Sequence, residues 1–222
     1  MEEVKKIWRT ADSVMFDVDS TVVTEEGIDE LAKFCGKGTE ISKITVEAMN
    51  MGLDYREALK LRLELMALTE QQLNDFLREH PISFTPGIEN LVKLLKQRNV
   101  DVYLVSGGFR RIIEPIRQRL ELPEENVFAN SIFFTAGKYT GFDINEPTSR
   151  NGGKAEVASL LKKKFGYKRL VMIGDGATDA EACPPADAFI GFGGNVVRES
   201  VKAKAKWFVT SFQEVIDELN MS

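Results

Sequence analysis

The sequence has very little histidine or cysteine. His80 is the only histidine in 222 residues, and it precedes Pro81 instead of following a predicted strand. A histidine nucleophile or a Ser-His-Asp relay is therefore not expected. The two cysteines, Cys35 and Cys183, are too few for a disulfide framework, lack metal-site spacing, and have no arginine six residues later. This excludes a phosphate-cradling cysteine loop and predicts two buried thiols in a reducing compartment.

The chain also lacks basic excess and long apolar runs. Its net charge is -5 and it has no basic patch, so a nucleic-acid partner is not expected. No apolar run approaches the length of a membrane span, and the first residues lack the apolar segment of a secretory signal. We therefore expect a cytoplasmic protein without nucleic-acid or membrane partners. The sequence leaves open whether it forms a homodimer.

Apolar runs alternate with helical patterns along most of the chain, which predicts an α/β fold with a parallel sheet. Residues 38–80 interrupt this alternation, because they show helical periodicity only. We predict an α/β core domain from residues 1–24 and 81–222. A small helical cap domain, residues 25–80, is inserted after the first strand. A β-hairpin is expected within residues 127–142.

Two apolar runs that read as buried strands end in pairs of acidic residues. Asp17 and Asp19 follow the first run, and Asp175 and Asp179 follow a run near the other end of the chain. Ligands bind beyond the carboxyl ends of strands in an open parallel sheet, so neighbouring strands would bring these carboxylates together. Like charges repel unless a cation lies among them, and the natural choice is Mg²⁺. We assign Asp175 to the metal, whereas Asp179 is also explained by the helix dipole.

Two further motifs suit an anion. Ser106-Gly107-Gly108 ends a strand before a helix, where a hydroxyl and backbone N–H groups suit a phosphate oxygen. A tight turn explains these glycines equally well. Lys154 lies on the apolar stripe of a helix, where a lysine needs an anionic partner unless it reaches out to solvent.

Two charged residues near or within the predicted cap have competing interpretations. Arg62 lies on an apolar stripe, where a guanidinium binds a carboxylate or merely packs its stem. Glu26, after the loop that follows Asp19, suits an ammonium group or the first turn of a helix.

The motifs, in this order, resemble those of the haloacid dehalogenase superfamily, and the similarity spans almost the whole chain. Residues 17–21 resemble its first motif, Ser106 its second, Lys154 its third and residues 174–179 its fourth. The resemblance implies a Rossmann-like core and a phosphatase that uses Mg²⁺. It is most specific to the members that act on O-phosphoserine in the last step of serine biosynthesis. A phosphatase of another small phosphate ester is the alternative. Intact motifs argue against a catalytically silent binding protein.

The resemblance also implies residue roles. Asp17 would be the nucleophile that forms an aspartyl-phosphate, and Asp19 the general acid and base. Mg²⁺ would be held by the side chains of Asp17 and Asp175 and the backbone carbonyl of Asp19, with Asp179 in support. The residues expected to contact the substrate are Glu26, Met49, Asn50, Arg62, Ser106, Gly107, Gly108, Lys154 and Thr178.

Within that set, Glu26 would take the substrate ammonium group and Arg62 its carboxylate, as an amino acid requires. Met49 matches a cap residue over the site. Asn50 departs from the family pattern, because a glycine is usual at that position, so packing of the cap or approach of its backbone to the phosphate is expected to differ.

Overall fold

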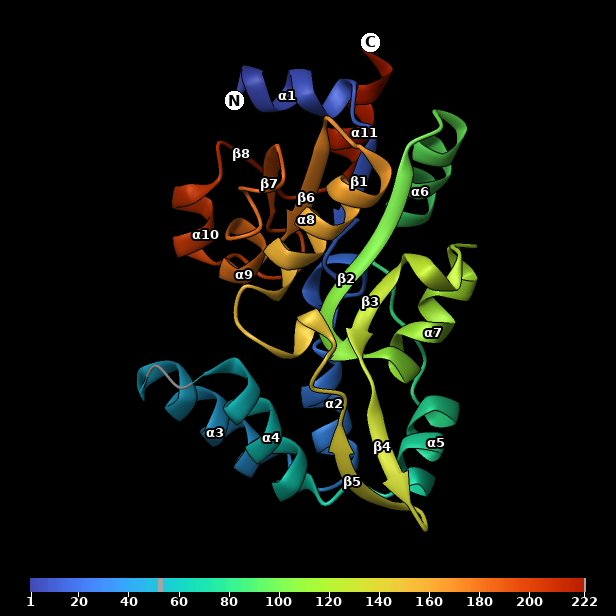
Figure 1. The fold of residues 1–222 in the computed structure, drawn as a ribbon, viewed down its shortest axis with the longest axis vertical. Coiled ribbons are helices and arrows are strands. Elements are labelled where there is room, and N and C mark those ends of the chain that lie inside the picture. The colour runs from blue at the N-terminus through green and yellow to red at the C-terminus, as the bar shows by residue number, and fades with distance from the viewer. Residues whose placement is uncertain (52–53, 222) are drawn as a thin grey trace.

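The centre of the fold, in this computed structural model, is a parallel six-stranded sheet in the order β3-β2-β1-β6-β7-β8 (Figure 1). The structure describes residues 1–51 and 54–221, without the side chains of residues 45–51. The strands are β1 Ser13–Phe16, β2 Asp101–Phe109, β3 Val127–Asn130, β6 Leu170–Gly174, β7 Ala188–Phe192 and β8 Trp207–Val209. Phe16 of β1 lies opposite Leu104 of β2 and Ile173 of β6. The carboxyl ends of these three strands therefore lie side by side.

Both faces of the sheet are covered by helices, which explains why its central strands are apolar throughout. Successive side chains of a strand point to opposite faces, so Val14 and Phe16 enter one apolar cluster and Met15 enters another. The first cluster lies under α1 Glu2–Arg9, α6 Ile88–Gln97, α7 Arg110–Arg119 and α11 Phe212–Asn220. The second lies under α8 Gly153–Phe165, α9 Ala177–Ala180 and α10 Glu199–Lys204.

A separate group of elements lies beyond the carboxyl ends of the strands (Figure 1). It contains α2 Gly27–Phe34, α3 Gly38–Met51, α4 Tyr55–Met66, α5 Glu70–Glu79 and the hairpin of β4 Ile132–Thr135 and β5 Lys138–Phe142. A third apolar cluster holds them together, with Leu31, Leu63 and Leu73 from the helices and Phe142 from the hairpin. Thr69 begins α5 with a capping box.

The predicted fold class is confirmed, but two local expectations differ from the structure. The hairpin occupies residues 132–142 only, whereas residues 127–130 form β3 and pair with β2 in the main sheet. Helix α1 was not predicted, because it is short and strongly charged, and only Val4 and Trp8 of its residues are buried. Among the described residues, no helix combines the length and apolar character needed to cross a membrane.

Candidate active site

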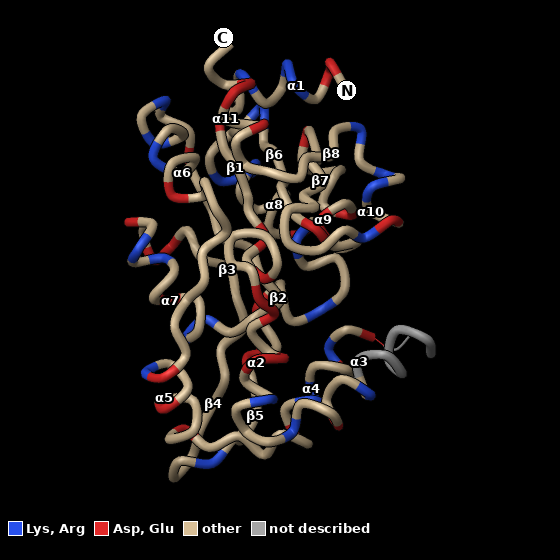
Figure 2. The backbone as a smooth tube through the Cα atoms, turned by 180° about the vertical axis from the view of Figure 1, so that it is seen from behind, with Lys and Arg blue, Asp and Glu red and all other residues tan. Residues whose placement is uncertain are grey.

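A cavity of about 580 Å³ lies at the carboxyl ends of β1, β2 and β6. Figure 2 shows acidic positions gathered in this middle part of the molecule, between the labels β2 and α2. The predicted site residues that line the cavity are Asp17, Asp19, Glu26, Arg62, Gly107, Gly108, Lys154, Asp175 and Thr178. Residues more than 150 positions apart in the sequence therefore share one cavity, as the order of the strands predicts.

Asp17 lies directly after β1 and is buried, with 8% of its surface exposed. Its Oδ1 lies 2.7 Å from Nζ of Lys154, which α8 presents from the neighbouring layer. Burial and the charge of Asp179 raise the pKa of Asp17 well above its usual range, against the opposing effect of Lys154. Burial acts to lower the pKa of Lys154, but the charges of Asp17 and Asp179 outweigh it and raise that pKa. Lys154 therefore stays protonated beside the carboxylate.

Asp19 is held in one orientation by two donors. Its Oδ1 accepts a hydrogen bond from the backbone N–H of Gly27 at 2.7 Å, and its Oδ2 accepts one from Oγ of Ser106 at 3.0 Å. A Cβ at Gly108 would lie 3.0 Å from Asp19 Oδ2 and 2.9 Å from Ser106 Oγ, so glycine keeps this contact open. Burial raises the pKa of Asp19 despite both hydrogen bonds. Its surroundings favour a carboxyl group that carries a proton more readily than an ordinary Asp.

A group of buried acidic residues has the donor set that suits Mg²⁺. Asp17, Asp175 and Asp179 each offer a carboxylate oxygen, and these oxygens lie within 4.8 Å of one another. Hard oxygen ligands are those that Mg²⁺ prefers. Lys154 pairs with Asp179 Oδ1 at 2.5 Å and with Asp17 Oδ1 at 2.7 Å, so Asp175 is the member of this group that has no contact with Lys154. The side chain of Asp19 is not in this group, and the ligand role expected of its backbone carbonyl stays a prediction.

Arg198, which the sequence did not single out, links two of the predicted residues. Its Nε donates to Asp175 Oδ2 at 2.8 Å, and its Nη2 donates to Glu26 Oε1 at 3.0 Å. The hydroxyl of Ser20 also donates to Glu26, at 2.9 Å. Burial, followed by the charge of Asp19, raises the pKa of Glu26. Glu26 is therefore a fixed carboxylate at the edge of the cavity, and not merely a first-turn acid.

Arg62 of α4 lines the cavity and is 9% exposed. Its Nε donates to the backbone carbonyl of Ala58 at 3.2 Å, and it forms no ion pair with any described residue. A buried guanidinium without a carboxylate partner is unusual, because burial of a charge is costly unless it is paired. The other α4 residue at the cavity, Tyr55, donates its hydroxyl to the carbonyl of Gly107 at 3.0 Å. Tyr55 could not have been singled out from the sequence, where its only distinguishing feature is its place on the same apolar stripe as Arg62.

The remaining predicted residues divide into two groups. Thr178 lies at the beginning of α9, exposed at the cavity, and Gly107 lies so close to Tyr55 that a Cβ would be 2.1 Å from its hydroxyl oxygen. The side chains of Met49 and Asn50 lie outside the described residues, and their predicted roles stay predictions.

Comparisons with known proteins agree with this geometry. A family model described as haloacid dehalogenase-like hydrolase matches residues 14–183. Phosphoserine phosphatase of Rattus norvegicus is 54% identical over 218 residues, covering 98% of this chain and 97% of the rat protein. The similarity therefore extends over nearly the full length of both chains.

Two solved structures have the same fold. The first, described as a phospho-aspartyl intermediate analogue of phosphoserine phosphatase, has a TM-score of 0.79 and 30% identity, over 93% of this chain and 98% of that chain. The second, DsGPDH of Dunaliella salina, has a TM-score of 0.86 and 37% identity over 99% of this chain. This chain spans only 38% of the Dunaliella chain.

Proposed function

The chain belongs to the haloacid dehalogenase-like hydrolase family, and on this premise we propose that it hydrolyses O-phosphoserine to serine and inorganic phosphate. One observation carries the proposal: buried Asp17, paired with Lys154, shares a cavity with the carboxylate of Glu26 and with the guanidinium of Arg62, which has no ion pair among the described residues. A nucleophile for phosphorus and a matched pair of charges for an amino acid are thus available in one place.

In the first step, a carboxylate oxygen of Asp17 attacks phosphorus and the bond from phosphorus to the serine oxygen breaks. Asp19 gives its proton to that oxygen, because an alkoxide is a poor leaving group; such acid catalysis contributes roughly 10²–10⁴-fold. The raised pKa of Asp19 suits this role. The product on the enzyme is an aspartyl-phosphate, which splits one difficult displacement into two easier ones.

In the second step, water attacks the phosphorus of the aspartyl-phosphate and Asp19 takes up its proton. The bond from phosphorus to Asp17 breaks, inorganic phosphate leaves, and both carboxyl groups return to their starting states. Lys154 contacts Asp17 directly, and Ser106 lies in the carboxyl-terminal half of the neighbouring strand β2 and contacts Asp19, so we assign both to the phosphoryl oxygens. Asp179 supports Lys154 through their 2.5 Å contact.

We assign Mg²⁺ to the carboxylates of Asp17 and Asp175 and the backbone carbonyl of Asp19. When bound, the ion offsets the repulsion between a carboxylate and a phosphate dianion. Thr21 donates to Asp175 Oδ1 at 3.1 Å and Arg198 to its Oδ2 at 2.8 Å, so the orientation of this ligand is fixed from both sides.

Substrate selection follows from charge. Arg62 takes the carboxylate of the substrate and Glu26 its ammonium group, so that both ends of the zwitterion are matched. Because Arg62 lies on α4 and Asp17 directly follows β1, we assign helices α2–α5 to the predicted cap, residues 25–80, over the core of residues 1–24 and 81–222. The reaction yields serine from a soluble ester, in accord with a cytoplasmic enzyme of serine biosynthesis. All of these residues belong to one chain, so the chemistry does not require a homodimer.

A phosphate-release assay tests the proposal, with O-phosphoserine, phosphoethanolamine and phosphoglycolate as substrates, each with and without Mg²⁺. We expect rapid phosphate release from O-phosphoserine only when Mg²⁺ is present. A folded Asp17→Asn variant should release no phosphate from this substrate. Faster release from phosphoglycolate than from O-phosphoserine would show that the substrate is another small phosphate ester. Release by the Asp17→Asn variant at the wild-type rate would remove Asp17 from the mechanism.

A further inference from the structure

A second cavity, of about 240 Å³, lies beside Asp19 and apart from most of the active site. Asp19 and Gly108 line both cavities, so they form the wall between them. Two linkers join helices α2–α5 to the sheet, residues 23–26 and residues 80–85, and both line this second cavity. They are hydrogen-bonded to each other, because the N–H of Thr24 donates to the carbonyl oxygen of Ser83 at 2.9 Å. The reaction proposed above makes no use of this space.

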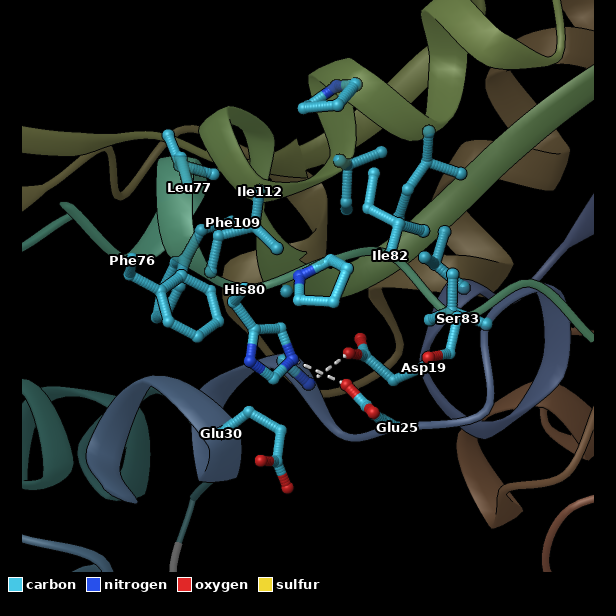
Figure 3. Close-up of a pocket in the computed structure, with 18 of the residues that line it drawn as sticks. Asp19, Glu25, Glu30, Phe76, Leu77, His80, Ile82, Ser83, Phe109 and Ile112 are labelled. Carbon is cyan, nitrogen blue, oxygen red and sulfur yellow. Dashed lines mark hydrogen bonds and ion pairs between the residues drawn. The ribbon is translucent and has the colours of Figure 1, made fainter. Parts of the chain in front are cut away.

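Most of the cavity wall is apolar (Figure 3). Phe76 and Leu77 come from α5, Ile112 and Ile116 come from α7, and Ile82 comes from the second linker. The volume suits a molecule of one ring and a short chain, since cavities of about 150 Å³ already bind benzene. An apolar body would gain by leaving water for this surface.

One end of the cavity is acidic. Glu25, Glu30 and His80 present side-chain atoms that lie within 4.8 Å of one another, and His80 Nε2 is 2.6 Å from Glu25 Oε2 (Figure 3). The imidazole stacks on Phe76 with 4.7 Å between ring centroids, so its position is fixed from the apolar side. Glu25 is thus held by the imidazole, and Glu30 lies beside this pair.

Two basic side chains near this end, those of Lys33 and Arg78, are exposed and form ion pairs at the surface. Lys33 bonds Glu30 at 2.5 Å but is 64% exposed, where solvent screens an ion pair. Arg78, which lines the cavity, is also 64% exposed and pairs with Asp75 and Glu79 on its own helix. Among the described residues, the charges of Lys33 and Arg78 therefore lie largely in solvent, and an ammonium group inside the cavity could meet Glu25 and Glu30 from the apolar side.

We propose that this cavity is a second binding site, for a small hydrophobic amine. The apolar body of the ligand lies against Phe76, Ile112 and Ile116, and its ammonium group lies beside Glu25 and Glu30. This occupant matches both the apolar walls and the two carboxylates at one end.

Methyl NMR on the full chain, labelled at isoleucine and free of substrate, tests the site with 4-phenylbutylamine and with its neutral counterpart, 4-phenylbutan-1-ol. We expect the methyl signals of Ile82, Ile112 and Ile116 to shift, and the amine to bind about fivefold more tightly than the alcohol, as one screened ion pair allows. Equal affinity of the two probes, or shifts confined to other isoleucines, would overturn the proposal. So would shifts of these methyls by Zn²⁺ but not by the amine, because the acidic end would then be a metal site.

Two variants locate the ligand. Glu30→Gln is expected to reduce the affinity of the amine to that of the alcohol and to leave the alcohol unchanged, whereas Glu64→Gln on α4 serves as the exposed control. Ile82→Trp, at a position 37% exposed, should weaken both probes by filling the cavity. Unchanged binding to a folded Ile82→Trp protein would place the ligand elsewhere. The binding assay contains no substrate, so its result does not depend on the proposed reaction.

Discussion

Replacement of Arg62 by alanine tests how the site selects an amino acid. Arg62 is 9% exposed and has no ion pair among the described residues, so its guanidinium is available to a ligand at little cost to the fold. The variant should therefore fold normally. Its defect should appear only with substrates that carry a carboxylate.

The size of the defect follows from burial. Truncating one partner of a buried, hydrogen-bonded charge pair costs about 2–5 kcal/mol. The cavity admits water to the space that the guanidinium vacates, so we take the lower part of that range. A loss of about 2–3 kcal/mol corresponds to a decrease of about 30- to 150-fold in kcat/KM for O-phosphoserine.

Phosphoethanolamine provides the matched substrate, because it keeps the ammonium group and the phosphate but lacks the carboxylate. For this ester, kcat/KM should decrease by less than about threefold in the Arg62→Ala variant. Phosphoethanolamine has no carboxylate, so it makes no interaction with Arg62 that the substitution could remove. Lys60→Ala, on the exposed side of α4, is the control variant and should leave both substrates unaffected. Equal losses for the two substrates would show that Arg62 only packs, and would refute the assignment.

Two further predictions concern the metal and the stability of the core. Chelation by EDTA should abolish phosphate release, and Mg²⁺ should restore it; activity that persists after chelation would remove the ion from the mechanism. Glu218→Gln should lower the free energy of unfolding by about 1 kcal/mol, because buried Glu218 accepts hydrogen bonds from Lys5 and Arg9 at 2.6 Å. The hydrogen bond from Lys5 is the main cause that lowers the pKa of Glu218 below 4.5. The stabilisation is therefore complete above that pH and is lost as the pH falls through the lowered pKa. Denaturant unfolding of both proteins should show the difference at pH 7 and not at pH 2.

The site residues that could be predicted are those whose position follows from the sequence pattern of a single strand or helix. Asp17 and Asp175 end apolar strands, and Lys154 lies on an inward helical stripe, so local patterns place each of them at the same edge of a parallel sheet. Arg62 could be placed on the apolar stripe of a helix, but its partner could not be predicted. Whether it binds a carboxylate or only packs its stem depends on which residues of other elements face it.

The parts that could not be predicted depend on contacts between distant elements. Arg198 precedes α10 in a segment without periodicity, and it reaches Asp175 only because β7 lies next to β6. Strand β3 has four residues, and only its pairing with β2 distinguishes it from the neighbouring hairpin. Local secondary-structure propensity predicts neither the contact between Arg198 and Asp175 nor the pairing of β3 with β2.

Covalent capture on Asp17 is the most direct test of the mechanism. The enzyme is mixed with O-phosphoserine and Mg²⁺, quenched in acid during turnover, digested, and examined by mass spectrometry for a phosphorylated carboxylate. We predict one phosphoryl group on the peptide that contains Asp17, and none in the Asp17→Asn variant. Steady turnover with that peptide unmodified, or with the phosphoryl group on another residue, would contradict the mechanism.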